Sequence, residues 1–74
     1  METDIWGRRV RAFRKLKGLT QEGLAKELGI SVSVLGEVER GSRVPKEDFL
    51  VKVAEVLQIS LDDLDPKGEL ENRQ

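Results

Sequence analysis

The sequence contains no cysteine and no histidine. Without cysteine, a disulfide framework, a thiolate metal site and a thiol nucleophile are all excluded. Without histidine, the chain also lacks the side chain that most often acts as a general base or a metal ligand. These absences argue against an enzyme and leave a binding module, with no cofactor, as the default expectation.

Long hydrophobic runs are missing as well. The apolar runs span only a few residues, whereas a membrane-crossing helix requires about 20. No basic segment followed by an apolar one opens the chain, so we expect no export signal, no membrane partner and a cytoplasmic location. A chain of 74 residues has room for one small domain with a single core.

The formal net charge of −1 combines two halves of opposite sign. Residues 1–46 carry ten Lys and Arg against six Asp and Glu, whereas residues 47–74 carry three against eight. Basic residues are densest in residues 8–17. A cationic side suits contact with phosphates, but a solvated helix face has the same composition, so charge alone does not identify a nucleic-acid ligand.

Apolar periodicity and turn residues predict five helices and no strand. Thr20, Ser31 and Ser60 are suited to cap the starts of helices, and several glycines are suited to end them. The predicted helices cover residues 4–17, 21–28, 32–40 and 46–57, followed by a short helix that starts after Ser60 and ends at Pro66. The polar stretch 66–74 predicts a flexible tail behind a domain of residues 1–65.

The predicted helices over 21–28 and 32–40 are joined by only three residues, Gly29-Ile30-Ser31. Helices joined this closely must cross steeply, which requires a small residue at the crossing and a permissive backbone at the turn. Ala25 and Gly29 meet these requirements. The segment therefore predicts a helix-turn-helix, whose second helix is presented to the major groove of DNA.

Several stretches resemble the lambda-repressor-like, Xre/Cro-type helix-turn-helix proteins of bacteria and phages. They are RAFRKLKGLTQEGLA (11–25), LGIS (28–31), ERG (39–41) and AEVLQISLDDL (54–64). The resemblance covers about residues 5–65. It implies an all-α domain of five helices and a transcriptional regulator that binds double-stranded DNA as a homodimer. Val56, Ile59 and Leu61 are the apolar residues available for a dimer contact after the fourth helix.

Helical geometry turns Ser33, Gly36, Glu37 and Arg40 away from the core, with Val32 at the N-terminal edge of the same helix. The resemblance implies base contacts at Val32, Ser33 and Glu37. The absent side chain of Gly36 would leave the face open to a close approach. Val32 suits a thymine methyl, Ser33 either kind of base and Glu37 a cytosine amine. No bidentate Arg or Gln contact is among them, so we expect weak or permissive sequence readout.

The sequence is better suited to contacts with DNA phosphates than to contacts with bases. The resemblance places Gln21 at a backbone phosphate, where the first amides of its helix also favour an anion. Arg40, Arg43 and Lys46, around the exit of helix 32–40, are the candidate cations, with simple solvated charge as the alternative for each. Glu37 needs a cationic neighbour close to phosphates, and Arg40 or Arg43 would supply it.

Arg14 and Glu39 have a structural interpretation. Relatives commonly pair residues at these positions, so the resemblance implies a partly buried ion pair beneath the helix-turn-helix. Removing one partner of such a pair strands a charge. Trp6 is predicted to belong to the core.

Two other classes of function stay open. A protein-interaction module would keep the scaffold without sequence readout, and the Glu-bearing recognition surface and acidic C-terminal half favour it. A metal-dependent activity at Asp62, Asp63 and Asp65 is the third hypothesis, although these carboxylates also fit the capped start of the last helix.

Overall fold

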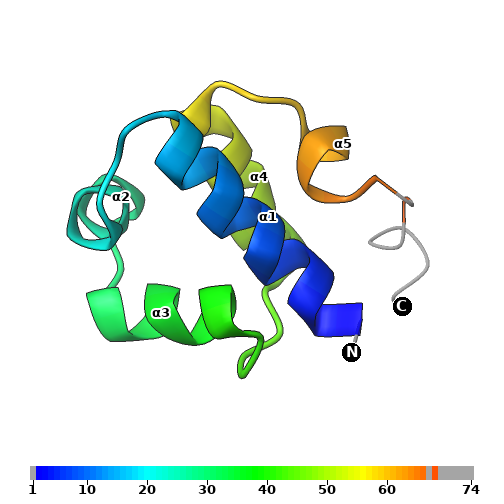
Figure 1. The fold of residues 1–74 in the computed structure, drawn as a ribbon, viewed down its shortest axis with the longest axis horizontal. Coiled ribbons are helices and arrows are strands. Elements are labelled where there is room, and N and C mark those ends of the chain that lie inside the picture. Colours follow the sequence, from blue (N-terminus) through cyan, green and yellow to red (C-terminus); the bar gives the residue numbers. More distant parts are fainter. Residues whose placement is uncertain (1, 67, 69–74) are drawn as a thin grey trace.

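The structure is a computed structural model that describes the backbone of residues 2–66 and 68 and the side chains of residues 5–66 and 68. In this part of the chain it contains five helices and no strand, so the predicted all-α class is confirmed (Figure 1). The helices are α1 (Glu2–Leu16), α2 (Gln21–Leu28), α3 (Val32–Arg40), α4 (Glu47–Leu57) and α5 (Leu61–Leu64). Among the described helices, none has the length and apolar character needed to span a membrane.

The bounds of α2 and α3 agree with the prediction because each helix has a strong signal at both ends. The hydroxyl of Thr20 accepts a hydrogen bond from the amide of Gly23 at 2.9 Å, and that of Ser31 accepts one from Val34 at 3.2 Å. A glycine in the left-handed region follows each helix. Hydroxyl caps of this kind typically stabilise a helix by about 1 kcal/mol.

The other boundaries shift where the sequence signals are weaker. α1 covers Glu2–Leu16 rather than 4–17, and α4 begins at Glu47 because Lys46 is extended and precedes the helix without a side-chain cap. α5 has the predicted capping box between Ser60 and Asp63. Residues 67 and 69–74 of the predicted tail lie outside the described residues.

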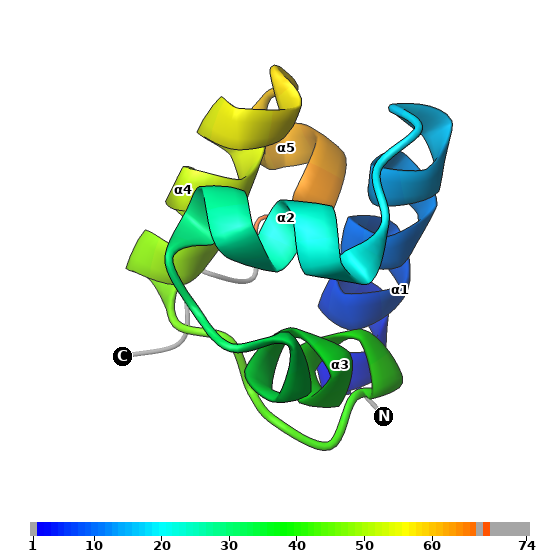
Figure 2. The same cartoon turned by 90° about the vertical axis from the view of Figure 1, so that its left-hand side faces the viewer.

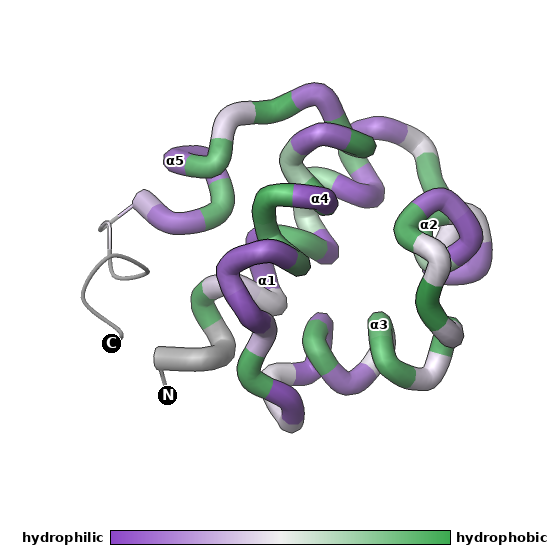
Figure 3. Tube along the Cα trace, turned by 180° about the vertical axis from the view of Figure 1, so that it is seen from behind, coloured by the Kyte–Doolittle hydropathy of each residue, from purple (hydrophilic) through white to green (hydrophobic). Residues whose placement is uncertain are grey.

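Each helix contributes an apolar stripe to one core, and Figure 3 shows hydrophobic and hydrophilic residues alternating along the helices. Full burial of a large aliphatic side chain contributes about 1.5–3 kcal/mol. The core therefore holds α2 and α3 in a fixed orientation against α1 and α4. Its buried members are Trp6, Val10, Leu24, Ala25, Leu28, Leu35, Leu50, Val53, Ala54, Leu57 and Leu64.

Trp6 is buried in this core, as predicted, and it joins the two ends of the domain. Its indole Nε1 donates a hydrogen bond to Asp65 Oδ1 at 3.1 Å, across 59 positions in the sequence. Asp65 is itself buried, so its hydrogen bond with Trp6 gives this carboxylate a structural role. In the described residues, no group of three or more acidic side chains is arranged to hold a metal ion.

α1 approaches the C-terminal half of α3 very closely. A Cβ added to Gly7 would overlap the carbonyl oxygen of Val38 and lie 3.1 Å from that of Glu39. Backbone atoms cannot move aside as a flexible side chain can, so this contact requires glycine. No motif or apolar periodicity in the sequence singles out Gly7.

Candidate nucleic-acid interface

The corner between α2 and α3 is tight. The two helices cross steeply in Figure 2, and residues 29–31 connect them. Gly29 has a φ of 72°, and the amide of Ile30 bonds back to the carbonyl of Ala25 at 3.0 Å. Ala25 is buried in the core. The corner thus has the geometry that the short connection predicts.

The first turn of α3 is open to solvent. Val32 is 40% exposed, and Ser33 is exposed beside it. Both stand at the end of the helix that meets base edges first when a helix enters the major groove. Glu37, one turn further along, keeps 39% of its side-chain surface exposed. These three residues are therefore accessible to a partner.

Gly36 differs from the expectation, because it is buried. A Cβ added there would lie 3.0 Å from Arg40 Nη1 and 3.8 Å from Gln21 Nε2. Residues four apart are neighbours on a helix surface, so the guanidinium of Arg40 lies back over the glycine. The missing side chain therefore makes room for Arg40 instead of leaving an open gap.

The expected ion pair beneath the helix-turn-helix is present and almost fully buried. Arg14 Nε donates to Glu39 Oε2 at 2.7 Å, and Arg14 Nη2 donates to Oε1 at 3.0 Å. Arg14 Nη1 also donates to the carbonyl of Leu19 at 2.8 Å. Only 8% of the Arg14 side chain and 1% of the Glu39 side chain are exposed. The pair ties α1, the loop after it and α3 together.

Gln21 is held by the same network at the start of α2. Its Nε2 donates to Glu39 Oε1 at 3.0 Å. This bond uses one of the two N–H groups of the amide, so the other is available to an acceptor such as a phosphate oxygen. The buried ion pair therefore fixes the side-chain amide of Gln21, the first residue of α2.

The three candidate cations after Gly36 are all exposed, but they are not equivalent. Arg40 covers Gly36, and Lys46 precedes α4. Arg43 Nε donates to Glu37 Oε1 at 2.7 Å, so Arg43 is the cationic neighbour that Glu37 requires. The sequence left this role open between Arg40 and Arg43.

A hollow between α1 and α3 adds basic residues that the sequence analysis did not assign. Glu39 is the acidic residue in its lining, and Arg14 neutralises that carboxylate, so the hollow is cationic. The basic density of residues 8–17 was a signal, but it did not show which arginines face α3. Its lining residues are Arg8, Arg11, Gln21, Glu39 and Arg40. A second hollow shares Arg8, Arg11 and Glu39 with it and is also lined by Ala12 and Lys15.

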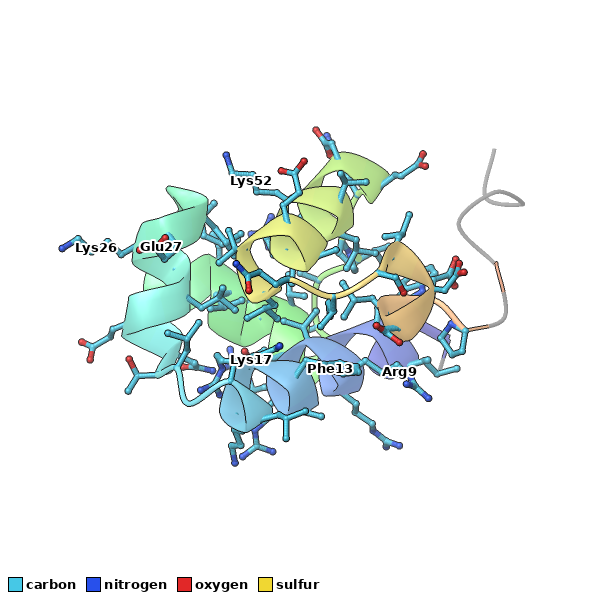
Figure 4. The ribbon with its side chains drawn as sticks, turned by 90° about the horizontal axis from the view of Figure 1, so that it is seen from above. Arg9, Phe13, Lys17, Lys26, Glu27 and Lys52 are labelled. Atoms are coloured by element: carbon cyan, nitrogen blue, oxygen red, sulfur yellow. The ribbon has the colours of Figure 1, made fainter. Side chains whose placement is uncertain are left out.

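The remaining arginines of α1 are used within the fold. Arg9 lies beside α5 in Figure 4, where its Nη1 donates to the carbonyl of Asp63 at 3.2 Å. Arg14 belongs to the buried ion pair. Arg8 and Arg11 are therefore the α1 arginines that line the hollow together with Gln21 and Arg40.

A helix-turn-helix family model matches residues 10–64. The uncharacterized HTH-type transcriptional regulator YazB of Bacillus subtilis (strain 168) is 65% identical over 66 residues, which are 89% of this chain and 96% of YazB. The HTH-type transcriptional regulator SinR of the same strain is 39% identical over 67 residues, 88% of this chain and 60% of SinR. The repressor protein C2 of Salmonella phage P22 is 36% identical over 70 residues, 95% of this chain and 32% of the repressor.

Two solved structures are similar over most of the chain. The restriction-modification controller protein C.AhdI from Aeromonas hydrophila has a TM-score of 0.80 and 38% identity, and the match covers 85% of this chain and 96% of C.AhdI. The clp gene regulator ClgR from Corynebacterium glutamicum has a TM-score of 0.85 and 30% identity, with 89% and 86% covered.

Proposed function

The chain belongs to the Xre/Cro-type helix-turn-helix family, and from this premise we propose that it is a small transcriptional regulator that binds double-stranded DNA. The observation that carries the proposal is the accessible first turn of α3 at a tight corner, with cationic groups beside it. Regulators with this task bind DNA in the cytoplasm of a bacterium, which is the proposed location.

In the proposed complex, α3 enters the major groove. Val32 and Ser33 then meet base edges through an apolar surface and a hydroxyl, which are permissive contacts. Glu37 reaches the same groove one turn later. This surface is small and mostly uncharged, so the affinity depends strongly on contacts with the phosphate backbone.

Those phosphate contacts are proposed at Gln21 and at the cations around it. Gln21 is positioned at the start of α2, where the helix dipole also favours an anion. Arg40, Arg43 and Lys46 are exposed at the exit of α3, and Arg8 and Arg11 extend the surface along α1. If four of these five cations each neutralise a phosphate, a plot of log affinity against log salt has a slope of about −3 to −4.

We propose that the protein binds as a symmetric dimer whose α3 helices enter successive major grooves, about 34–36 Å apart. Val56, Ile59 and Leu61 are the proposed contact residues. All three are partly buried against the protein's own core, which leaves only part of each side chain for a partner. Light scattering during gel filtration, with and without a DNA duplex, tests the assembly.

A protein-interaction role is the second candidate function, and the acidic Glu37 is the feature that favours it. The Glu37–Arg43 pair weakens that argument, because the carboxylate no longer presents an unpaired negative charge to DNA. The relatives are also named as transcriptional regulators. DNA binding is therefore the better supported function.

A gel-shift titration on random duplex DNA at increasing salt tests the proposal, followed by selection of preferred sequences. Arg40→Gln should weaken binding and reduce the salt slope by about one. Lys52→Gln is the matched control, because it removes one positive charge from α4 on the face shown in Figure 4, away from α3. Absence of binding at about 50 mM salt and tens of micromolar protein would contradict the proposal, since even non-specific complexes form in that range.

A further inference from the structure

The loop after α3 holds an arginine beside the recognition surface. Arg43 Nε donates to Glu37 Oε1 at 2.7 Å, and 52% of the Arg43 side chain stays exposed. Ser42 fixes the path of the loop, because its amide and its hydroxyl both bond to the carbonyl oxygen of Glu37, at 2.9 and 3.2 Å. Arg43 is thus placed by the loop backbone as well as by its own ion pair.

The ion pair with Glu37 leaves the two terminal nitrogens of the Arg43 guanidinium available for a ligand. The bond to Glu37 uses Nε, whereas the two terminal nitrogens, Nη1 and Nη2, make no hydrogen bond to the rest of the described chain. Two parallel N–H groups at this end match either the O6 and N7 atoms of guanine or two oxygens of a phosphate.

We propose that Arg43 reads a guanine in the major groove and that Glu37 is the positioning residue that holds its guanidinium. This inference rests on the proposed function. Glu37 lies on the accessible face of α3, so a group bonded to its carboxylate lies at that face too. Val32 and Ser33 offer no bidentate contact, so Arg43 supplies the discrimination that α3 lacks.

The assignment changes two expectations from the sequence. Arg43 becomes a base contact instead of a phosphate contact, and Glu37 acts through Arg43 instead of accepting from a cytosine amine. The loop after α3, and not the helix alone, then sets part of the sequence preference.

Sequence selection from randomised duplexes tests the inference with the wild type, Arg43→Gln, Glu37→Gln, the double variant and Arg40→Gln as the matched control. We expect the wild type to select a guanine in each half-site. Arg43→Gln should reduce the preference for that guanine by about tenfold to a hundredfold. Glu37→Gln should weaken the preference for the same guanine, and the double variant should be no worse than Arg43→Gln alone. Arg40→Gln should keep the motif.

Other outcomes separate the failure of this inference from the failure of the proposed function. If Arg43→Gln weakens binding equally on all sequences and reduces the salt slope by about one, Arg43 contacts a phosphate and the inference is wrong. If Glu37→Gln changes the preference at a base pair that Arg43→Gln leaves unaltered, Glu37 reads that base pair directly and the inference is also wrong. If the wild type binds DNA without any sequence preference, the inference is wrong but the proposed function stands. If the wild type does not bind DNA, both the proposed function and the inference are wrong.

Discussion

Glu37 and Glu39 stand two residues apart on α3, and each accepts a hydrogen bond from the Nε of an arginine at 2.7 Å. Two positions along a helix turn a side chain to nearly the opposite face. Glu39 and Arg14 are 1% and 8% exposed, whereas Glu37 and Arg43 are 39% and 52% exposed. One helix thus carries the same pair of groups in two different environments.

The two environments give the two pairs different roles. The inner pair, Glu39 with Arg14, has further partners in the carbonyl of Leu19 and the side-chain amide of Gln21. It therefore fixes the helices and cannot turn to a ligand. The outer pair, Glu37 with Arg43, is exposed to solvent, where an ion pair contributes little to stability. Burial therefore makes one pair structural and leaves the other available for binding.

Glu39→Ala tests the inner pair and should have the largest effect. The substitution leaves the buried guanidinium of Arg14 without its carboxylate, so we expect a loss of about 3–5 kcal/mol of stability. For a domain of this size that lowers the melting temperature by more than about 12 °C. The emission of the single, buried Trp6 reports the transition, because it shifts to the red when the protein unfolds. An unchanged melting temperature would show that the inner pair does not stabilise the fold.

Gly7→Ala tests the packing that surrounds the inner pair. The added methyl group would meet the backbone carbonyl of Val38, so α1 must move away from α3. We expect a loss of about 1–3 kcal/mol, as is usual for an overpacked core, measured by urea unfolding. Full stability in this variant would show that the contact between α1 and α3 is loose.

Gly36→Ala is the corresponding change on the outer face. Here the methyl group meets Arg40 Nη1, the end of a flexible side chain, at 3.0 Å. Alanine favours a helix over glycine by about 1 kcal/mol, so we expect unchanged or slightly higher stability. DNA affinity should fall, because the guanidinium of Arg40 is displaced. A variant with lost stability and unchanged affinity would contradict this assignment.

Glu37→Ala should cost far less stability than Glu39→Ala. The outer pair is exposed, so its removal should cost no more than about 1 kcal/mol in thermal or urea unfolding. The comparison with Glu39→Ala uses the same substitution on the same helix, two residues away. Equal losses for the two variants would refute the distinction between the inner and outer pairs.

Local signals explain which helices the sequence predicts well. α2 and α3 have a hydroxyl cap at one end and a glycine at the other, and these interactions involve neighbours within a few residues. Their bounds therefore follow from short segments. The start of α4 lacks such a side-chain cap, and there the predicted start differs by one residue from the observed one.

The contacts around α3 are harder to predict from the sequence, because they depend on the conformation of side chains and of a loop, or on residues far apart in the chain. Arg40 and Arg43 were equal candidates for the partner of Glu37, because both lie close to it in the sequence. The path of the loop at Ser42 brings Arg43 to Glu37, while Arg40 lies over Gly36. The approach of α1 to α3 at Gly7 likewise depends on packing between segments some thirty positions apart, which periodicity does not predict.

The hydrogen bond between Trp6 and Asp65 has a consequence for protein engineering. A fragment that stopped after α4 would retain both helices of the DNA-contacting corner, yet it would lose Leu64 from the interior and the carboxylate that receives the indole N–H. The helix-turn-helix is thus not a transplantable unit in this protein. A minimal domain for grafting must extend to Asp65, because Leu64 and Asp65 hold α1 in place.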